Sequence, residues 1–199
     1  MAERQSNNRG GIGILIMTGG SARRFGGRRK LLLPYEGRTF LEHILEAFRG
    51  MDRIRLSVDR PEPYADLGFP MVIDRYPGCG PLGGIAGALE ECPEEAQFVV
   101  ACDMPFISGE AVQALMQAYL ESGSITLATD GVNLEPLFGI YPQSVLPEAQ
   151  KMLSEGIRKT RILFERCGGR LVQIGGADRI FRNINTPGEY RKYIGELPE

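Results

Sequence analysis

The sequence has almost no histidine and no close pair of cysteines. Its one histidine is His43, and its four cysteines are Cys79, Cys92, Cys102 and Cys167. None of these forms a C-x-x-C pair, so the chain has neither the spacing of a zinc site nor the framework of a disulfide-rich secreted protein. A catalytic triad needs a histidine beside its nucleophile. The lone His43 lies in a run with helical spacing, where a packing or surface role is expected.

Charge of one sign and long apolar runs are also missing. The 199 residues include 23 Lys and Arg against 25 Asp and Glu, a formal net charge of −2, which gives no basic field for a nucleic acid. The longest apolar runs, residues 11–17 and 98–102, are far shorter than the ~20 residues of a membrane span. Residues 1–10 are polar, lack the apolar core of a signal peptide and are expected to form a disordered arm. We expect a cytoplasmic protein with neither nucleic acid nor membrane as partner.

What the sequence does have is an alternation of short apolar runs and amphipathic stretches. Strands are predicted at residues 12–17, 54–58, 70–74, 97–103, 125–129, 137–142, 170–174 and 181–185. Helices are predicted at residues 39–50, 84–92, 108–122, 144–156 and 160–168, with a last helix from about Thr186. Repeated strand–helix units form parallel sheets with helices on both faces. The predicted fold class is therefore α/β, a three-layer α/β/α sandwich around a mostly parallel, Rossmann-like sheet.

The strongest local signal is the segment MTGGSARRFGGRRKLLLP, residues 17–34, directly after the first predicted strand. It holds four glycines and five cations, namely Arg23, Arg24, Arg28, Arg29 and Lys30. Glycines let backbone N–H groups approach a phosphate, and cations neutralise its charge. The segment matches neither the P-loop pattern G-x-x-x-x-G-K-[ST] nor the dinucleotide fingerprint G-x-G-x-x-G. It is interpreted as an anion site, with a solubilising surface loop and an RNA-contacting loop as alternatives.

Two aspartates end predicted strands. Asp103 closes QFVVACD and precedes Met104-Pro105, where the proline turns the chain and leaves the carboxylate at the strand tip. Asp74 ends PMVID. Ligands of open α/β sheets bind beyond the carboxyl ends of the strands, so both aspartates and the glycine-rich loop are expected at one edge. A carboxylate facing a phosphate-binding loop suits Mg²⁺; a structural turn is the alternative role.

Three further polar residues carry weaker signals. Glu135, in NLEPLFGIY, precedes a proline and is interpreted as a solvated turn residue. Asn183 and Asn185, in RNINTP, stand at a predicted strand end, where an amide could hydrogen-bond a pterin or a sugar. They could equally form a turn and cap the helix that begins near Thr186.

Together these segments resemble the molybdenum cofactor guanylyltransferases of the MobA type, in the nucleotidyltransferase superfamily. The family's opening pattern, roughly L-A-G-G-x-S-x-R-M-G-x-D-K-x-L-L, is similar to MTGGSARRFGGRRKLLLP, and VIDRYPGCGPLGGI, VVACDMPF, EPLFGIYP and NINTPGEY follow in the family's order. The resemblance covers about residues 12–193. It implies one nucleotidyltransferase domain over residues 11–199.

The resemblance also implies roles for individual residues. The catalytic residues would be Lys30, which holds the phosphates, and Asp103, which holds Mg²⁺. The nucleotide, GTP, would also be bound by Met17, Thr18, Gly19 and Asp74. The pterin would lie near Gly80, Pro81, Leu82, Asn183 and Asn185.

Three positions depart from the family's pattern. Thr18 stands where the family has Ala, and Arg29 stands where it has the Asp before the lysine. An Asn that contacts nucleotide in some members falls near Ser57, with Asp59 two residues on. The departure at Arg29 concerns the orientation of Lys30, because it removes the carboxylate that the family pattern places beside that lysine.

The implied reaction joins the terminal phosphate of Mo-bound molybdopterin to the α-phosphorus of GTP, forms molybdopterin guanine dinucleotide and releases pyrophosphate. The phosphate nucleophile is already an anion, so positioning and charge neutralisation are expected to carry catalysis. The alternatives are a molybdopterin cytidylyltransferase that uses CTP, a sugar-1-phosphate nucleotidyltransferase, and a non-catalytic nucleotide-binding adaptor. Because the product is unstable, transient contact with other molybdenum cofactor biosynthesis proteins or molybdoenzyme chaperones is expected.

Overall fold

A computed structural model of the chain describes residues 11–19, 25 and 27–197. The predicted arm, residues 1–10, lies outside the described residues, as do Arg23 and Arg24 of the glycine-rich segment. That residues 11–199 form a single nucleotidyltransferase domain stays a prediction.

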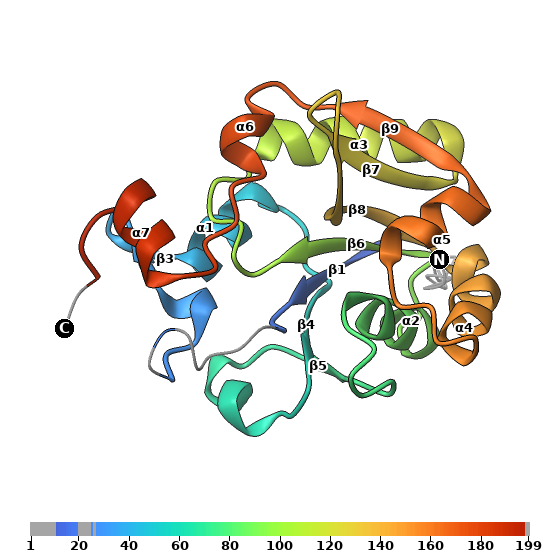
Figure 1. The fold of residues 1–199 in the computed structure, drawn as a ribbon, viewed down its shortest axis with the longest axis horizontal. Helices are drawn as coiled ribbons and strands as arrows, with labels where there is room; N and C mark the ends of the chain where they lie inside the picture. Colours follow the sequence, from blue (N-terminus) through green and yellow to red (C-terminus); the bar gives the residue numbers. More distant parts are fainter. Residues whose placement is uncertain (1–10, 20–24, 26, 198–199) are drawn as a thin grey trace, which may run out of the picture.

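A seven-stranded sheet forms the centre of the molecule, in the order β5-β4-β1-β6-β8-β7-β9 (Figure 1). Its strands are β1 Ile12–Met17, β4 Ile54–Val58, β5 Met71–Ile73, β6 Ala96–Ala101, β7 Ile125–Thr129, β8 Leu134–Pro142 and β9 Gly169–Gln173. β8 runs antiparallel to β6 and β7, and the other neighbouring pairs are parallel. β1 and β6 are buried along almost their whole length, which is why they read as continuous apolar runs.

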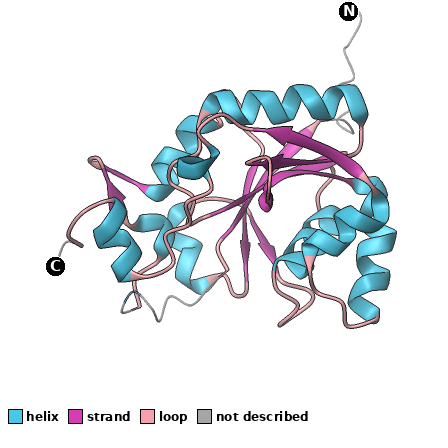
Figure 2. Ribbon diagram, turned by 45° about the horizontal axis from the view of Figure 1, so that its top comes forward, coloured by secondary structure: helices cyan, strands magenta, loops and turns pink. Residues whose placement is uncertain are grey.

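Helices cover both faces of this sheet, and successive side chains of a strand point to opposite faces. On one face Ile14 and Ile16 pack with α1 Phe40–Ala47, α3 Gly109–Ser122 and α6 Ala177–Ile180. On the other face Leu15 and Met17 pack with α2 Pro81–Glu91, α4 Leu146–Ser154 and α5 Thr160–Cys167. Figure 2 shows the helices on both sides of the strands. The predicted α/β fold with three layers is confirmed.

A smaller unit lies beside the sheet. The two-stranded sheet of β2 Pro34–Tyr35 and β3 Arg38–Thr39 lies near α7 Pro187–Tyr193 (Figure 1). Phe25, Leu33, Tyr35, Phe40, Ile184 and Tyr190 form its own apolar cluster. The hydroxyl of Tyr190 donates a hydrogen bond to the carbonyl of Pro34. This cluster brings the segment around Ile184 next to the end of the glycine-rich segment.

The remaining elements are short, and among the described residues no helix is long and apolar enough to cross a membrane. Three 3-10 helices are η2 Lys30–Leu32, η3 Glu62–Leu67 and η4 Gln143–Val145. The strand predicted at residues 181–185 is wrong: these residues are irregular. Their backbone donors bond elsewhere, because the N–H groups of Asn185 and Thr186 donate to the carboxylate of Glu189 at the start of α7.

Candidate active site

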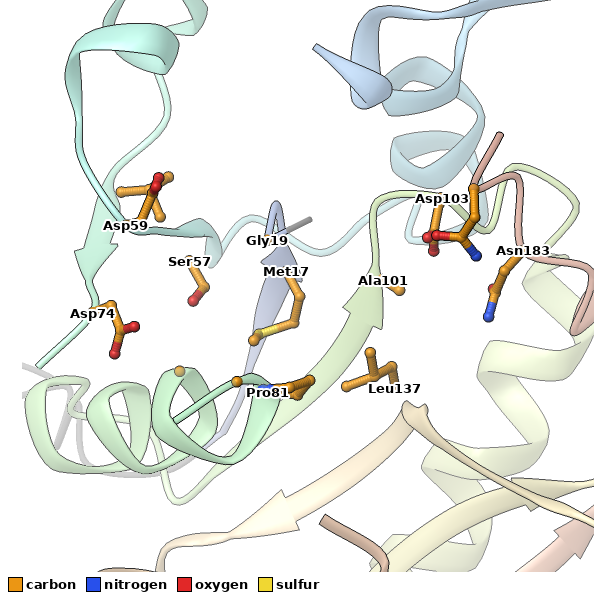
Figure 3. Close-up of a pocket in the computed structure, with 14 residues that line it drawn as sticks. Met17, Gly19, Ser57, Asp59, Asp74, Pro81, Ala101, Asp103, Leu137 and Asn183 are labelled. Carbon is orange, nitrogen blue, oxygen red and sulfur yellow. The ribbon is translucent and has the colours of Figure 1, made fainter. Parts of the chain in front are cut away.

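A cavity of about 460 Å³ opens at the carboxyl ends of the parallel strands β1, β4, β5 and β6. Met17, Gly19, Asp74 and Asp103 line it, as the sequence predicts for one edge of the sheet. Asn183, Asn185, Gly80 and Pro81 line it as well. Figure 3 shows Asp59 and Asp74 at one end of the cavity and Asp103 and Asn183 at the other. The cavity therefore has two polar ends joined by an apolar middle.

Lys30 is buried next to one end of the cavity; it does not line the cavity, but it contacts two residues that do. Its ammonium donates to Oδ2 of Asp103 at 3.0 Å and to Oδ1 of Asn185 at 2.7 Å. The side chains of Lys30 and Asp103 are 6% and 13% exposed, so this ion pair is almost fully buried. The carbonyl of Asp103 also accepts from the N–H of Ile184 at 2.9 Å. Asp103 and the 183–185 segment are thereby held against each other and against Lys30.

Two oxygens at this end lack partners. Within the described residues, Oδ1 of Asp103 and Oδ1 of Asn183 are buried and accept no hydrogen bond. A buried acceptor without a partner costs free energy, so this end suits a ligand that supplies positive charge or donors. Mg²⁺ fits, because it takes oxygen ligands and is commonly held by one or two carboxylates together with phosphate oxygens. The described residues contain no cluster of three or more acidic, cysteine or histidine side chains, so the protein alone would not complete its coordination.

The other end of the cavity is built from the ends of β4 and β5. The N–H of Asp74 donates to the carbonyl of Val58 at 2.8 Å, and its Oδ1 accepts from the N–H of Tyr76 at 2.8 Å. Oδ1 of Asp59 accepts from the N–H of Arg60 at 3.0 Å. Each carboxylate is thus oriented by backbone at the cavity wall, and each has lone pairs left for a ligand.

The polar groups of Thr18 bond to another residue of the chain, and Thr18 does not line the cavity. It is buried, its hydroxyl donates to the carbonyl of Ser57 at 2.6 Å, and its N–H donates to the same oxygen at 3.1 Å. Thr18 therefore ties the end of β1 to the end of β4. The resemblance implies that Thr18 contacts the nucleotide, and this stays a prediction, although Thr18 is not among the residues that line the cavity.

The helix α2 brings its N-terminus to the cavity. Gly80 has φ +64°, a conformation that L side chains rarely adopt, and the helix begins at Pro81. A Cβ on Gly84 would lie 2.6 Å from Cε of Met17, so this glycine permits the close approach of helix and strand. Leu82, expected near the pterin, is instead fully buried in the core beneath α2. Positive charge at a helix N-terminus favours a phosphate.

Glu135 is a residue that reasoning from sequence misjudged. It lies in β8, where the register with β7 shifts between Leu127 and Ala128, and it is half-buried instead of solvated. Its Oε1 accepts from the N–H of Leu137, a residue of the cavity wall, at 3.0 Å. Burial raises the pKa of Glu135, and the charge of Asp103 adds to that rise. The signal in the sequence was the place of Glu135 in EPLFGIYP, one of the segments that carry the family resemblance. β-Bulges such as the one here often re-aim side chains near functional sites.

Comparison with known proteins identifies the family. The family model described as MobA-like NTP transferase domain matches residues 14–171. The molybdenum cofactor guanylyltransferase of Vibrio cholerae is 30% identical over 181 residues, which cover 90% of this chain and 89% of the relative. The enzyme of the same name from Vibrio parahaemolyticus is 31% identical over 185 residues, which cover 92% of this chain and 94% of the relative.

Solved structures share the fold. Molybdopterin-guanine dinucleotide biosynthesis protein A from Archaeoglobus fulgidus has a TM-score of 0.74 at 24% identity, over 90% of this chain and 95% of that chain. The 2-C-methyl-D-erythritol 4-phosphate cytidylyltransferase from Thermus thermophilus has a TM-score of 0.62 at 19% identity, over 88% and 93% of the two chains. The family model covers most of the chain, and the relatives match nearly end to end. This protein belongs to the family of MobA-like NTP transferase domains.

Proposed function

We propose that this chain transfers GMP from GTP to the terminal phosphate of Mo-bound molybdopterin, which yields molybdopterin guanine dinucleotide and pyrophosphate. Its relatives are named molybdenum cofactor guanylyltransferases, which supports nucleotidyl transfer in molybdenum cofactor biosynthesis. The observation that carries the proposal is the buried contact of Lys30 with Asp103 and Asn185, beside the unpartnered Oδ1 of Asp103. A carboxylate and an amide at the wall of this cavity, with a buried cation behind them, suit a triphosphate.

In this reaction a phosphate oxygen of molybdopterin forms a bond to the α-phosphorus of GTP. The bond from that phosphorus to the oxygen bridging to the β-phosphorus breaks, and its electron pair leaves with pyrophosphate. Lys30 and the N-terminus of α2 would hold the phosphates in line and neutralise the charge that develops on them. Asp103, with the amide oxygens of Asn185 and Asn183 beside it, would hold Mg²⁺, and bound Mg²⁺ supplies further positive charge to the phosphate oxygens.

The far end of the cavity would take the base. Asp59 and Asp74 present carboxylates there, and an ionised carboxylate is purely an acceptor of hydrogen bonds. The Watson–Crick edge of guanine carries two adjacent donors, the N1–H and the 2-amino group, whereas that of cytosine carries one donor, the 4-amino group. Carboxylates at this end therefore favour GTP over CTP, and the cytidylyltransferase is the alternative.

Titration calorimetry with GTP, CTP and ATP, each with and without Mg²⁺, tests the proposal. We expect GTP to bind most tightly, and we expect Mg²⁺ to tighten binding to the wild type but not to Asp103→Ala. A preference for CTP would assign the same site to the cytidylyl reaction. Incubation with GTP and Mo-bound molybdopterin then separates enzyme from adaptor, because an adaptor would bind GTP without forming pyrophosphate.

A further inference from the structure

We propose that the 3-10 helix η3, Glu62–Leu67, is a brace that positions Lys30 by holding Arg29, the residue before it. The inference rests on the proposed function, since it assigns a positioning residue to the same site. Asp66 is the side chain of the brace that contacts Arg29. The family pattern that the sequence resembles assigns it no role.

Asp66 holds Arg29 by a two-point contact. Nη1 of Arg29 donates to Oδ1 of Asp66 at 2.5 Å, and Nη2 donates to Oδ2 at 2.9 Å. Nη1 also donates to the carbonyl of Pro63 at 2.6 Å. Three hydrogen bonds to one segment fix the plane of the guanidinium, as a single exposed ion pair would not. The Asp66 carboxylate raises the pKa of Arg29, so the charge of this contact is present at every physiological pH.

The position of Arg29 matters because Lys30 follows it. Arg29 caps the short helix η2, and its carbonyl accepts from the N–H of Leu32 at 3.0 Å. The ammonium of Lys30 reaches Asp103 and Asn185 from this same turn, at 3.0 and 2.7 Å. Because Arg29 and Lys30 belong to the same turn, holding Arg29 restricts where the ammonium of Lys30 can lie.

The brace is itself preorganised. Pro61 caps η3 and Pro63 lies in its first turn, so two backbone dihedrals are fixed by their rings. The N–H of Tyr64 donates to the carbonyl of Pro61 at 2.9 Å, and Gly68 ends the helix with φ +72°. Tyr64 and Leu67 also pack against the core under β1 and β4. A segment anchored in this way can transmit its position to Arg29.

One departure from the family pattern meets this segment. Arg29, in place of Asp, brings the guanidinium that Asp66 contacts. An aspartate at position 29 would be repelled by Asp66. In this chain Arg29 and Asp66 therefore form one device that orients Lys30.

The variant Asp66→Asn separates the brace from a plain charge effect. Removing a negative charge near the site makes the potential at the triphosphate more positive, so electrostatics alone predicts tighter GTP binding. A brace predicts the opposite, because the two-point contact with Arg29 is weakened. We expect GTP to bind Asp66→Asn about tenfold less tightly than the wild type. Arg161→Ala, which breaks an exposed ion pair with Glu165 on α5, is the matched control and should bind as the wild type.

The swapped pair Arg29→Asp/Asp66→Arg supplies the rescue. We expect each single change to raise the GTP dissociation constant and the KM, and the double variant to recover most of the loss. Hydrogen–deuterium exchange without nucleotide completes the test, because Asp66→Asn should speed exchange of the amides of residues 28–33. If Asp66→Asn exchanges faster but the wild type binds no nucleotide, the brace stands and the proposed function is overturned. GTP affinity and exchange both unchanged in Asp66→Asn would overturn the brace.

Discussion

The ammonium of Lys30 lies 3.0 Å from Oδ2 of Asp103, and both side chains are almost fully buried. Each of these buried charges is compensated only by its partner. Removing one of them therefore leaves an uncompensated charge out of water. The pair therefore links folding to function: the carboxylate proposed to hold Mg²⁺ is the one that neutralises the lysine proposed to hold phosphate. Stability and activity should separate when both partners are changed together.

We first predict that Lys30→Met and Asp103→Asn each destabilise the protein, by about 3 kcal/mol. The double variant should lose much less than the sum of the two, because no unpaired charge is left buried. Denaturant unfolding measures these free energies. Guanylyl transfer should fall about 100-fold or more in all three variants. Additive losses of stability would show that the two groups do not interact as the distances indicate.

A second prediction concerns recognition of the guanine base by Asp59. Inosine triphosphate lacks the 2-amino group of GTP, so the wild type should bind it more weakly, by about tenfold. Asp59→Asn should narrow that difference, because an amide is a poorer acceptor for the two guanine donors. Asp52→Asn, an exposed aspartate just before the amino end of β4, is the control. Equal discrimination by wild type and Asp59→Asn, measured by calorimetry, would place the base elsewhere.

Much of the fold could be predicted because it depends on local patterns. Continuous apolar runs such as residues 12–17 are buried on both faces, and the carboxyl ends of parallel strands must share an edge, which placed Asp74 and Asp103 correctly at one cavity. The contact of Lys30 with Asn185 joins residues 155 positions apart, and its geometry depends on how α7 packs. No spacing rule gives that contact.

The errors have a similar origin. The segment 181–185 has the composition of a strand, but its backbone donors bond elsewhere, so it forms no ladder: the N–H of Ile184 donates to the carbonyl of Asp103, and that of Asn185 donates to Glu189. Glu135 precedes a proline, as turn residues often do, yet the bulge in β8 places it against the core. For Arg29, the sequence shows the departure but not its partner, because Asp66 lies 37 positions away in a segment that reads as a loop.

A third prediction follows from the raised pKa of Glu135. A carboxyl whose pKa is higher in the folded state favours folding in its protonated form, and that stabilisation is lost as pH rises through the folded pKa. Glu135→Gln keeps an acceptor for the N–H of Leu137 without the charge, so it should stabilise the protein at pH 7. The gain should shrink as pH falls toward the ordinary value of 4.5. Denaturant unfolding from pH 4.5 to pH 7.5 measures the free energy of unfolding of the wild type and of Glu135→Gln. A difference between the two that does not change with pH would contradict the titration of Glu135.

The last prediction compares two glycines of α2. A Cβ on Gly84 would lie 2.6 Å from Cε of Met17 and 2.7 Å from Oγ of Ser57, so Gly84→Ala must displace these two side chains or move the helix away from β1 and β4. We expect a loss of about 1–3 kcal/mol in the free energy of unfolding and weaker GTP binding, since Met17 and Ser57 line the cavity. Gly87→Ala is the matched control, because its Cβ would meet nothing closer than Val72 Cγ1 at 3.9 Å. It should stabilise the helix by about 0.5–1 kcal/mol and leave binding unchanged. If Gly84→Ala behaved as Gly87→Ala does in unfolding and in calorimetry, close approach of α2 would not shape the nucleotide site.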